Sequence, residues 1–110
     1  MMNRIVMAFL FFLTVVGCAR GIAPPSSPGE RSGEELFGQH CAMCHPDGGN
    51  VVKPSKTLAR QVLDGNNIKT LNDIVWVMRN PELGMTRFHV DTLSETDARK
   101  IAAYVMETFK

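Results

Sequence analysis

The sequence predicts an all-α protein, and three observations carry that prediction. Apolar residues recur with a helical period in several segments, residue pairs with helix-capping spacing precede those segments, and no run alternates between apolar and polar as a strand does. The chain has 110 residues, enough for one small domain once a leading export signal is set aside. Domains of this size bury little surface, so a disulfide, a metal or a cofactor often completes their stability.

Residues 1–17 are typical of a secretory signal. One positive charge at Arg4 precedes an apolar run, residues 5–16, that is too short to cross a bilayer as a mature helix. The run ends in Val15-Val16-Gly17-Cys18, which resembles a bacterial lipobox. This resemblance implies that Cys18 is lipidated, becomes the new N-terminus and anchors the protein through several acyl chains. The alternative is an ordinary signal peptide with an incidental Cys18.

Residues 18–31 are rich in Pro, Gly and Ser and have no periodic apolar face. We therefore expect a flexible tether there and one folded domain over residues 32–110. The domain opens with Ser32 and Glu35, whose spacing is that of a capping box. The first predicted helix runs from this box through Phe37 to a close pair of cysteines.

Three further helices are predicted from the same signals. One covers residues 55–64 and is ended by Gly65. The next starts at Thr70, which has an Asp three residues later, and ends at Asn80-Pro81. The last begins at Ser94 and continues with a helical period through the C-terminus.

The net charge and the spacing of the cysteines restrict the classes of function that the chain can have. The formal net charge is +1, and no segment concentrates Lys and Arg without acids among them, so nucleic-acid binding is not indicated. Of the three cysteines, Cys18 stands alone, whereas Cys41 and Cys44 form a pair followed at once by His45. This distribution does not indicate a disulfide framework.

The segment Cys41-Ala42-Met43-Cys44-His45 is the attachment motif of c-type haem. Two thiols add across the two vinyl groups on one haem edge, so they must be held a short, fixed distance apart, as i and i+3 are on a helical turn. The adjacent imidazole then approaches the iron from one face, which makes His45 the expected proximal ligand. The predicted export signal agrees with this reading, because this attachment takes place outside the cytoplasm.

The motif has three other possible interpretations. A thioredoxin-like dithiol expects a βαβ context, which the sequence lacks. A zinc site needs further ligands, and neither a second cysteine pair nor a close histidine pair is present. Two structural thiols beside a surface histidine are the third alternative.

The sixth iron ligand distinguishes an electron carrier from an enzyme, because an iron with both axial positions filled has no place for a substrate. Met85 is the preferred candidate, since it lies in a loop between two predicted helices, whereas Met78 and Met106 fall within helical patterns. His40 and His89 are alternative ligands. Either histidine, His40 above all, is also a candidate for coupling the redox potential to pH.

The sequence resembles the class I cytochromes c and, more closely, the cytochrome c-six branch. The resemblance covers residues 33–109 and rests on Gly33, Phe37, the cysteine motif, the segments 47–52 and 56–58, and Ile101-Ala102-Ala103-Tyr104-Val105. It implies the class I cytochrome c fold, one covalent haem c, and iron ligation by His45 and Met85. In that fold the first and last helices cross at the small and aromatic positions.

Two departures from the branch stand near the expected haem. Thr86 replaces the proline that usually follows the methionine ligand, and Val77 stands where a glutamine is common. The predicted lipobox and tether are foreign to the soluble photosynthetic members. The chain is more similar to the small monohaem outer-membrane cytochromes of metal-respiring bacteria.

The expected function is therefore one-electron transfer in the cell envelope by a non-enzymatic haem protein. The resemblance implies a lipid-anchored monomer at the outer membrane. It also implies a place in a metal-reducing respiratory chain, with larger redox partners such as multihaem cytochromes. The alternative is a haem-based sensor or peroxidase-like protein whose sixth ligand is displaced by a small molecule.

Overall fold

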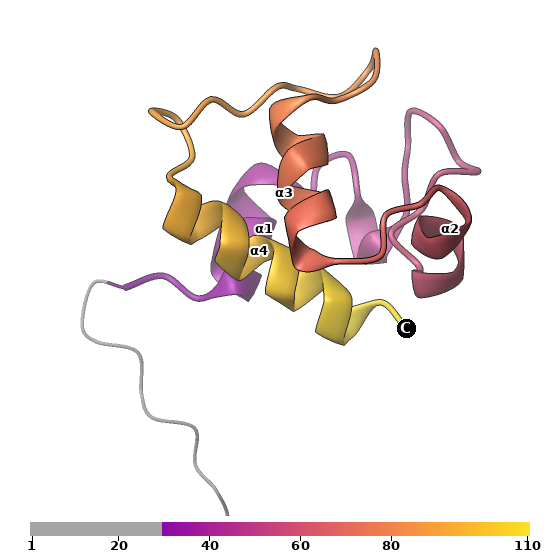
Figure 1. Cartoon of the computed structure of the whole chain (residues 1–110), viewed down its shortest axis with the longest axis horizontal. Helices are drawn as coiled ribbons and strands as arrows, with labels where there is room; N and C mark the ends of the chain where they lie inside the picture. The colour runs from indigo at the N-terminus through magenta and orange to yellow at the C-terminus, as the bar shows by residue number, and fades with distance from the viewer. Residues whose placement is uncertain (1–29) are drawn as a thin grey trace, which may run out of the picture.

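The computed structural model describes residues 30–110, so the predicted signal, Cys18 and most of the predicted tether lie outside the described residues. The all-α prediction is confirmed, since this part of the chain contains helices and loops and no strand (Figure 1). The elements in chain order are α1 (Gly33–His40), the short 3-10 helix η1 (Pro46–Gly48), α2 (Arg60–Gly65), α3 (Leu71–Arg79) and α4 (Glu95–Thr108).

The predicted caps begin three of the four α-helices. The Ser32 hydroxyl accepts a hydrogen bond from the amide of Glu35, and the Glu35 carboxylate accepts one from the amide of Ser32. Thr70 and Asp73 form the same reciprocal box at α3. The Ser94 hydroxyl accepts from the amide three residues later and begins α4. Each cap satisfies an amide that has no partner within its helix.

The prediction of a helix over residues 55–64 is wrong in its first half, because α2 begins only at Arg60. Two long-range hydrogen bonds account for the difference. The amide of Leu58 donates to the carbonyl of Gly48 at 2.7 Å, and the amide of Arg60 donates to the carbonyl of Phe109 at 2.9 Å. These bonds hold the segment in an irregular, bent conformation against distant parts of the chain, where a helix would have used local partners.

Helices α1 and α4 cross at small and aromatic residues, as the class I cytochrome c resemblance implies. The backbone of Gly33 lies directly against that of Lys100. Next to this contact the rings of Phe37 and Tyr104 lie 5.3 Å apart between centroids. Helix α4 also packs against α3 and contributes much of the buried core. The buried apolar residues are Leu36, Phe37, Leu63, Ile74, Val75, Met78, Phe88, Leu93, Ala98, Ile101, Ala102 and Val105.

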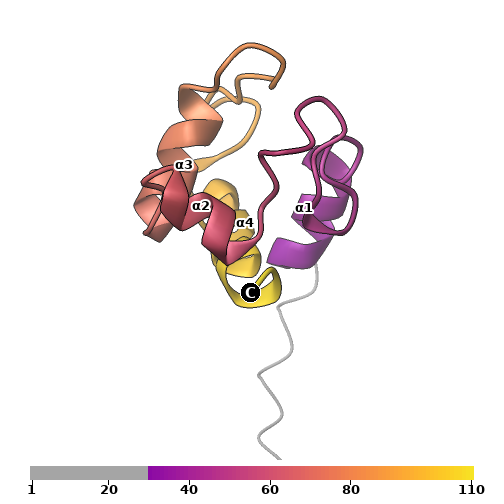
Figure 2. The ribbon, with the colours of Figure 1, turned by 90° about the vertical axis from the view of Figure 1, so that its right-hand side faces the viewer.

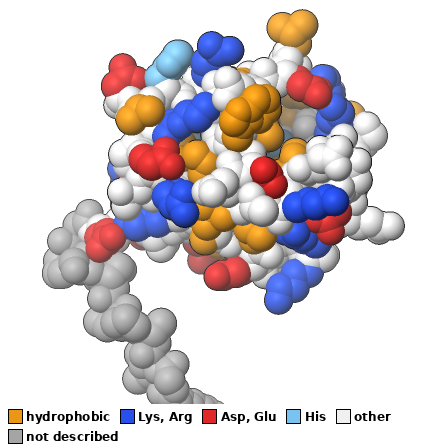
Figure 3. Space-filling model, viewed as in Figure 1, with side chains coloured by type: hydrophobic (Ala, Val, Ile, Leu, Met, Phe, Trp, Pro, Cys, Tyr) orange, Lys and Arg blue, Asp and Glu red, His pale blue; other side chains and the backbone are white. Residues whose placement is uncertain are grey.

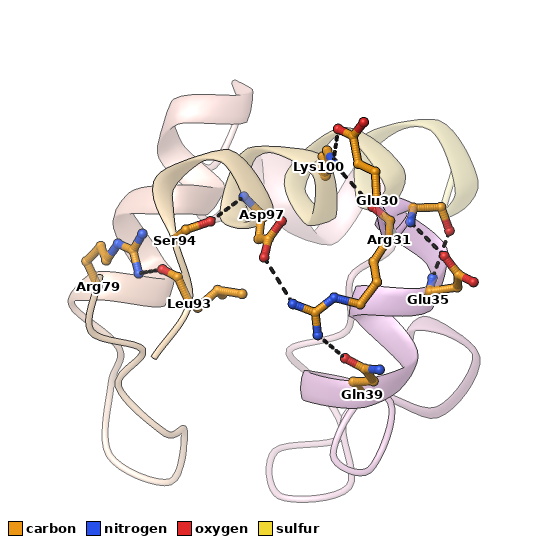
Figure 4. Close-up of polar contacts among 10 residues, drawn as sticks. Glu30, Arg31, Glu35, Gln39, Arg79, Leu93, Ser94, Asp97 and Lys100 are labelled. Carbon is orange, nitrogen blue, oxygen red and sulfur yellow. Dashed lines mark hydrogen bonds and ion pairs between the residues drawn. The ribbon is translucent and has the colours of Figure 1, made fainter. Parts of the chain in front are cut away.

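The two described residues of the predicted tether lie against the domain (Figure 4). The guanidinium of Arg31 donates to the Gln39 side chain at 2.8 Å and pairs with Asp97 at 3.4 Å. Glu30 pairs with the ammonium group of Lys100. These exposed contacts join the start of the domain to both α1 and α4, although each contributes little to stability.

The α-helices of residues 30–110 form a frame, and each of them contributes residues to the wall of one cavity inside it. Figure 2 shows α1 and the following segment on one side, α2, α3 and the loop after α3 on the other, and α4 crossing beneath them. The surface around this frame is mixed: Figure 3 shows basic and acidic side chains interspersed on one face, with apolar side chains between them. No helix formed by residues 30–110 is long and apolar enough to span a membrane.

Candidate functional site

A cavity of about 410 Å³ lies between the two sides of this frame. The four residues that the sequence singles out for haem binding all line it: Cys41, Cys44, His45 and Met85. The first three come from the segment after α1, and Met85 comes from the loop between α3 and α4. Folding therefore brings residues 40 positions apart in the chain, His45 and Met85, to one cavity.

The paired cysteines lie in a turn immediately after α1. The amides of Cys44 and His45 both donate to the carbonyl of Cys41, at 3.1 and 2.9 Å. This turn keeps the helical i, i+3 relation between the two thiols, although α1 itself ends at His40. Both cysteines are free. Burial, and to a smaller degree Cys44, raises the pKa of the Cys41 thiol to about 11, so this thiol is protonated at neutral pH.

The imidazole of His45 is oriented by the backbone that follows it. Its Nδ1 lies 2.7 Å from the carbonyl oxygen of Gly49. A carbonyl oxygen only accepts, so Nδ1 carries the proton and Nε2 keeps the lone pair that a metal requires. The tight turn before Gly49 makes this contact possible: Asp47 and Gly48 have φ of 51° and 77°, a left-handed conformation that glycine adopts readily.

The loop that carries Met85 is held at both ends by the core. Arg79, at the end of α3, donates from Nη1 to the carbonyls of Phe88 at 2.8 Å and Leu93 at 2.9 Å. The amide of Phe88 donates to the carbonyl of Met78 at 2.9 Å. Between these anchors Met85 is half-buried and lines the cavity. The thioether is therefore presented from the wall that α3 and its loop form.

The other residues that the sequence places near the expected haem differ in whether they line the cavity. His40 and Val77 line the cavity. The His40 ring packs edge-on against Phe88, with 5.9 Å between the centroids. His89 is exposed and does not line the cavity. Of the two alternative histidines, His40 is thus the one placed near the expected haem.

One group of polar residues at the cavity is not predicted from the sequence. The carboxylate of Glu82 accepts from Lys56 at 2.6 Å and from Lys53 at 3.0 Å. The hydrogen bond from Lys56, followed by that from Lys53, lowers the pKa of Glu82. The side chain of Asn50 forms hydrogen bonds with the backbone of both lysines. In the sequence, Asn50 and Pro54 indicate only that this segment forms a turn. The contact between residues 53 and 82 joins distant parts of the chain, so no local spacing predicts it.

Comparison with known proteins agrees with this geometry. The family model described as cytochrome C oxidase, cbb3-type, subunit III matches residues 28–105. Cytochrome c6 from Cyanidium caldarium is 39% identical over 74 residues, which are 67% of this chain and 66% of that protein. Cytochrome c6 from Bumilleriopsis filiformis is 35% identical over 75 residues, 68% of this chain and 86% of that protein. The solved structure of OmcF, an outer-membrane cytochrome from Geobacter sulfurreducens, is 47% identical, with a TM-score of 0.70, and the match covers 72% of this chain and 100% of that chain.

These similarities and the fold define a class I c-type cytochrome, a monohaem protein of electron transfer. Within that class, the chain belongs to the family whose model it matches and lies near cytochrome c6 and OmcF. It carries one covalently bound c-type haem.

The residues that line the cavity fit such a group. Two free thiols stand next to an imidazole whose Nδ1 is already engaged, and a thioether lines the same cavity. Soft sulfur and imidazole nitrogen are the axial donors that low-spin haem iron takes. Apolar side chains such as Leu63 and Ile101 line the same cavity and suit the flat, apolar macrocycle.

Proposed function

We propose that Cys41 and Cys44 hold the haem through thioether bonds and that His45 and Met85 are the axial ligands of its iron. The observation that carries the proposal is that all four residues line one cavity, with Met85 on a loop far from the cysteine turn in sequence. The turn of residues 41–45 fixes the spacing of the thiols and the position of the imidazole together. Nε2 of His45 is the free ring nitrogen.

This arrangement supports electron transfer more than catalysis. The iron supplies a one-electron ferric–ferrous couple when the haem is bound. Two protein ligands would fill both axial positions and leave none for a substrate. The apolar part of the cavity wall would limit the access of water to the iron, and His45 and Met85 would hold the iron without taking part in a reaction. We therefore propose a non-enzymatic carrier that exchanges single electrons with larger redox proteins.

We also propose that the carrier works as a monomer in the cell envelope, at the outer membrane, in a respiratory chain of the metal-reducing type. The predicted signal over residues 1–17 and the lipobox ending in Cys18 support export and a lipid anchor. The similarity to OmcF, whose name describes an outer-membrane cytochrome, supports the location. Residues 18–31 would act as the tether, and multihaem cytochromes are the partners of suitable chemistry.

The ligand assignment is tested by purifying the chain from cells that attach haem c and recording mass and visible spectra. We expect the mass of one haem and, in the ferric protein, the weak red absorption band of a thioether–iron bond. Met85→Ala should abolish that band and give high-spin spectra with rapid uptake of added ligands. Met43→Ala is the matched control, because Met43 lies between the two cysteines and is 90% exposed.

Three results would contradict the proposal. A wild-type ferric protein that is high-spin and takes up small ligands at once favours the sensor or peroxidase-like alternative. A red band that survives in Met85→Ala and disappears in Met43→Ala would show that the wrong methionine was chosen. A colourless product of a cell competent in haem attachment would overturn the haem site itself.

The anchor is tested separately by replacing Cys18→Ser in the full chain. We expect the wild-type protein to fractionate with membranes and to incorporate a labelled fatty acid, whereas Cys18→Ser should do neither. Haem content of the two proteins made in the same cells is the control for export. Equal membrane association of both proteins would exclude lipidation at Cys18.

A further inference from the structure

Glu82 connects the two walls of the cavity. It lies three residues before Met85, in the loop between α3 and α4, and is exposed. One oxygen of its carboxylate, Oε2, accepts from Nζ of Lys56 at 2.6 Å and from Nζ of Lys53 at 3.0 Å. Both lysines line the cavity from the segment that follows the cysteine turn. The ion pairs therefore join the Met85 loop to the segment beyond His45.

The segment that carries the lysines is itself held in place by Asn50. The side-chain oxygen of Asn50 accepts from the amides of Val52 at 3.0 Å and Lys53 at 2.8 Å, and its Nδ2 donates to the carbonyl of Lys56 at 3.0 Å. These bonds form an Asx-type turn, which restricts the backbone on which both ammonium groups are mounted. A positioned pair of lysines loses less conformational entropy on binding a carboxylate than free ones.

A second contact lies beside the ion pairs. Gly84 has φ of +99°, and a Cβ there would meet the Val52 side chain at 3.0 Å, so the two segments touch next to Met85. The Met85 amide donates to the carbonyl of Glu82 at 3.3 Å, which closes a turn from the charged residue to the thioether. A movement of Glu82 away from the lysines would thus carry Met85 with it.

Residues 82–86 all line the cavity, so a bound haem would add contacts to this loop, but its other contacts with the rest of the protein are few. Leu83 is 94% exposed, and Gly84 and Thr86 are exposed as well, so Met85 is the one half-buried residue between residues 82 and 86. Thr86 also leaves its φ free, where a proline would restrict it. Exposed ion pairs contribute little to global stability, but the opening of one loop involves few contacts, so the same pairs are a large part of what opposes it.

We propose that Glu82, paired with Lys53 and Lys56, is a positioning residue that holds the loop of residues 81–86 over the haem and slows the departure of the Met85 sulfur from the iron. These three residues form the strap. The inference rests on the proposed ligation by Met85 and adds to it a device that sets how long the sixth ligand stays bound. It concerns the rate of ligand exchange and leaves the identity of the ligands unchanged.

The experiment measures the uptake of imidazole by the purified ferric holoprotein. At saturating imidazole the uptake rate reports how fast Met85 leaves, and a neutral ligand is not steered by the charges that the variants change. We expect Glu82→Gln and the double variant Lys53→Gln/Lys56→Gln to raise this limiting rate about two- to tenfold, the range that exposed ion pairs support. Combining all three substitutions should add little, because each removes the same interaction.

Two controls make the test specific. Glu107→Gln removes an exposed carboxylate from α4, away from the strap, and should leave the rate unchanged. Raising the salt concentration from about 0.01 M to about 1 M should speed uptake in the wild type and barely affect Glu82→Gln, since salt screens exposed charges. Hydrogen exchange of the amides of residues 83–86 gives a second readout, and it should be faster in Glu82→Gln.

The outcomes separate the strap from the proposed ligation. If the wild type shows the thioether band, Met85→Ala loses it, and Glu82→Gln equals Glu107→Gln in rate, salt response and amide exchange, the strap is overturned and the ligation stands. If the wild type lacks the thioether band and behaves as Met85→Ala does, the ligation fails. In that case faster amide exchange in Glu82→Gln would still show the ion pairs closing the loop, without a sulfur ligand to hold.

Discussion

The backbone of Gly33 lies against the carbonyl oxygen of Lys100 so closely that a Cβ on Gly33 would overlap that oxygen. This contact sets the distance between α1 and α4. We expect Gly33→Ala to lower the free energy of unfolding by about 1–3 kcal/mol, because the two helices must separate to admit one methyl group. Denaturant unfolding of the holoprotein measures the change.

Gly38 supplies the matched control in the same helix. A Cβ there meets no heavy atom within 4 Å. Gly38→Ala should therefore raise the stability by about 0.5–1 kcal/mol, the usual advantage of alanine over glycine within a helix. Equal losses in the two variants would show that the helix crossing is not the cause.

Arg79 fastens the ends of the loop that carries Met85. Its guanidinium donates to two backbone carbonyls, those of Phe88 and Leu93, and its side chain is 17% exposed. Figure 4 shows the bond to Leu93. We expect Arg79→Lys to cost about 2 kcal/mol of unfolding free energy, since a single ammonium group does not reproduce the fork of donors. The temperature of thermal unfolding and the intensity of the thioether band should both decrease.

Arg99→Lys is the corresponding control on α4. Arg99 also donates from Nη1, to Asn72 at 2.8 Å, but both partners are exposed. Its replacement should change the unfolding free energy by less than about 0.5 kcal/mol. If Arg99→Lys lowered the free energy of unfolding as much as Arg79→Lys, the partly buried bonds of Arg79 to the two carbonyls would contribute no more than an exposed hydrogen bond.

Two capping carboxylates should make the stability depend on acid pH. Hydrogen bonds with the amide and then the hydroxyl of Ser32 lower the pKa of Glu35 below its ordinary value of 4.5. Hydrogen bonds led by that from the amide of Lys69 lower the pKa of Asp73 below its ordinary value of 3.8. The unfolded chain binds these protons more readily than the folded one. Each carboxylate therefore stabilises the fold above its ordinary pKa, and the contribution is lost as the pH falls through the folded pKa.

The measurement is the free energy of unfolding at steps from about pH 6 to about pH 3. Glu35→Gln and Asp73→Asn keep much of the shape of each cap but do not titrate. We expect their stability to fall less steeply with acid than that of the wild type, so that the curves converge at low pH. Parallel curves over the whole range would show that neither carboxylate contributes through its charge.

Gly48 combines a left-handed backbone with a close neighbour. Its φ is +77°, and a Cβ would overlap the ring of Phe109. Gly48→Ala should cost about 2–4 kcal/mol, the sum of backbone strain and steric overlap. In a Phe109→Leu background the steric part should shrink, and denaturant unfolding of the double-mutant cycle would isolate it. Strict additivity would leave the backbone as the sole cause.

The features that the sequence predicted well depend on partners within a few residues. Ser32, Thr70 and Ser94 begin helices because their hydroxyls bond amides three residues later, a relation that spacing alone expresses. The cysteine motif is recognisable for the same reason, since its two thiols and its imidazole lie in one turn. Met85 lines the cavity, but so does Met78, so the choice of Met85 as the iron ligand stays a prediction.

The tertiary structure decided what depends on distant partners. Residues 55–59 stay out of α2 because the amides of Leu58 and Arg60 bond carbonyls elsewhere in the chain. The pairing of Glu82 with two lysines nearly thirty residues earlier arises in the same way. A local pattern records the energies of near neighbours, whereas these bonds exist only after α1, α3 and α4 have brought their partners together. The sequence alone therefore identified the haem-binding chemistry, and only the folded chain revealed the ion pairs that Glu82 makes with Lys53 and Lys56.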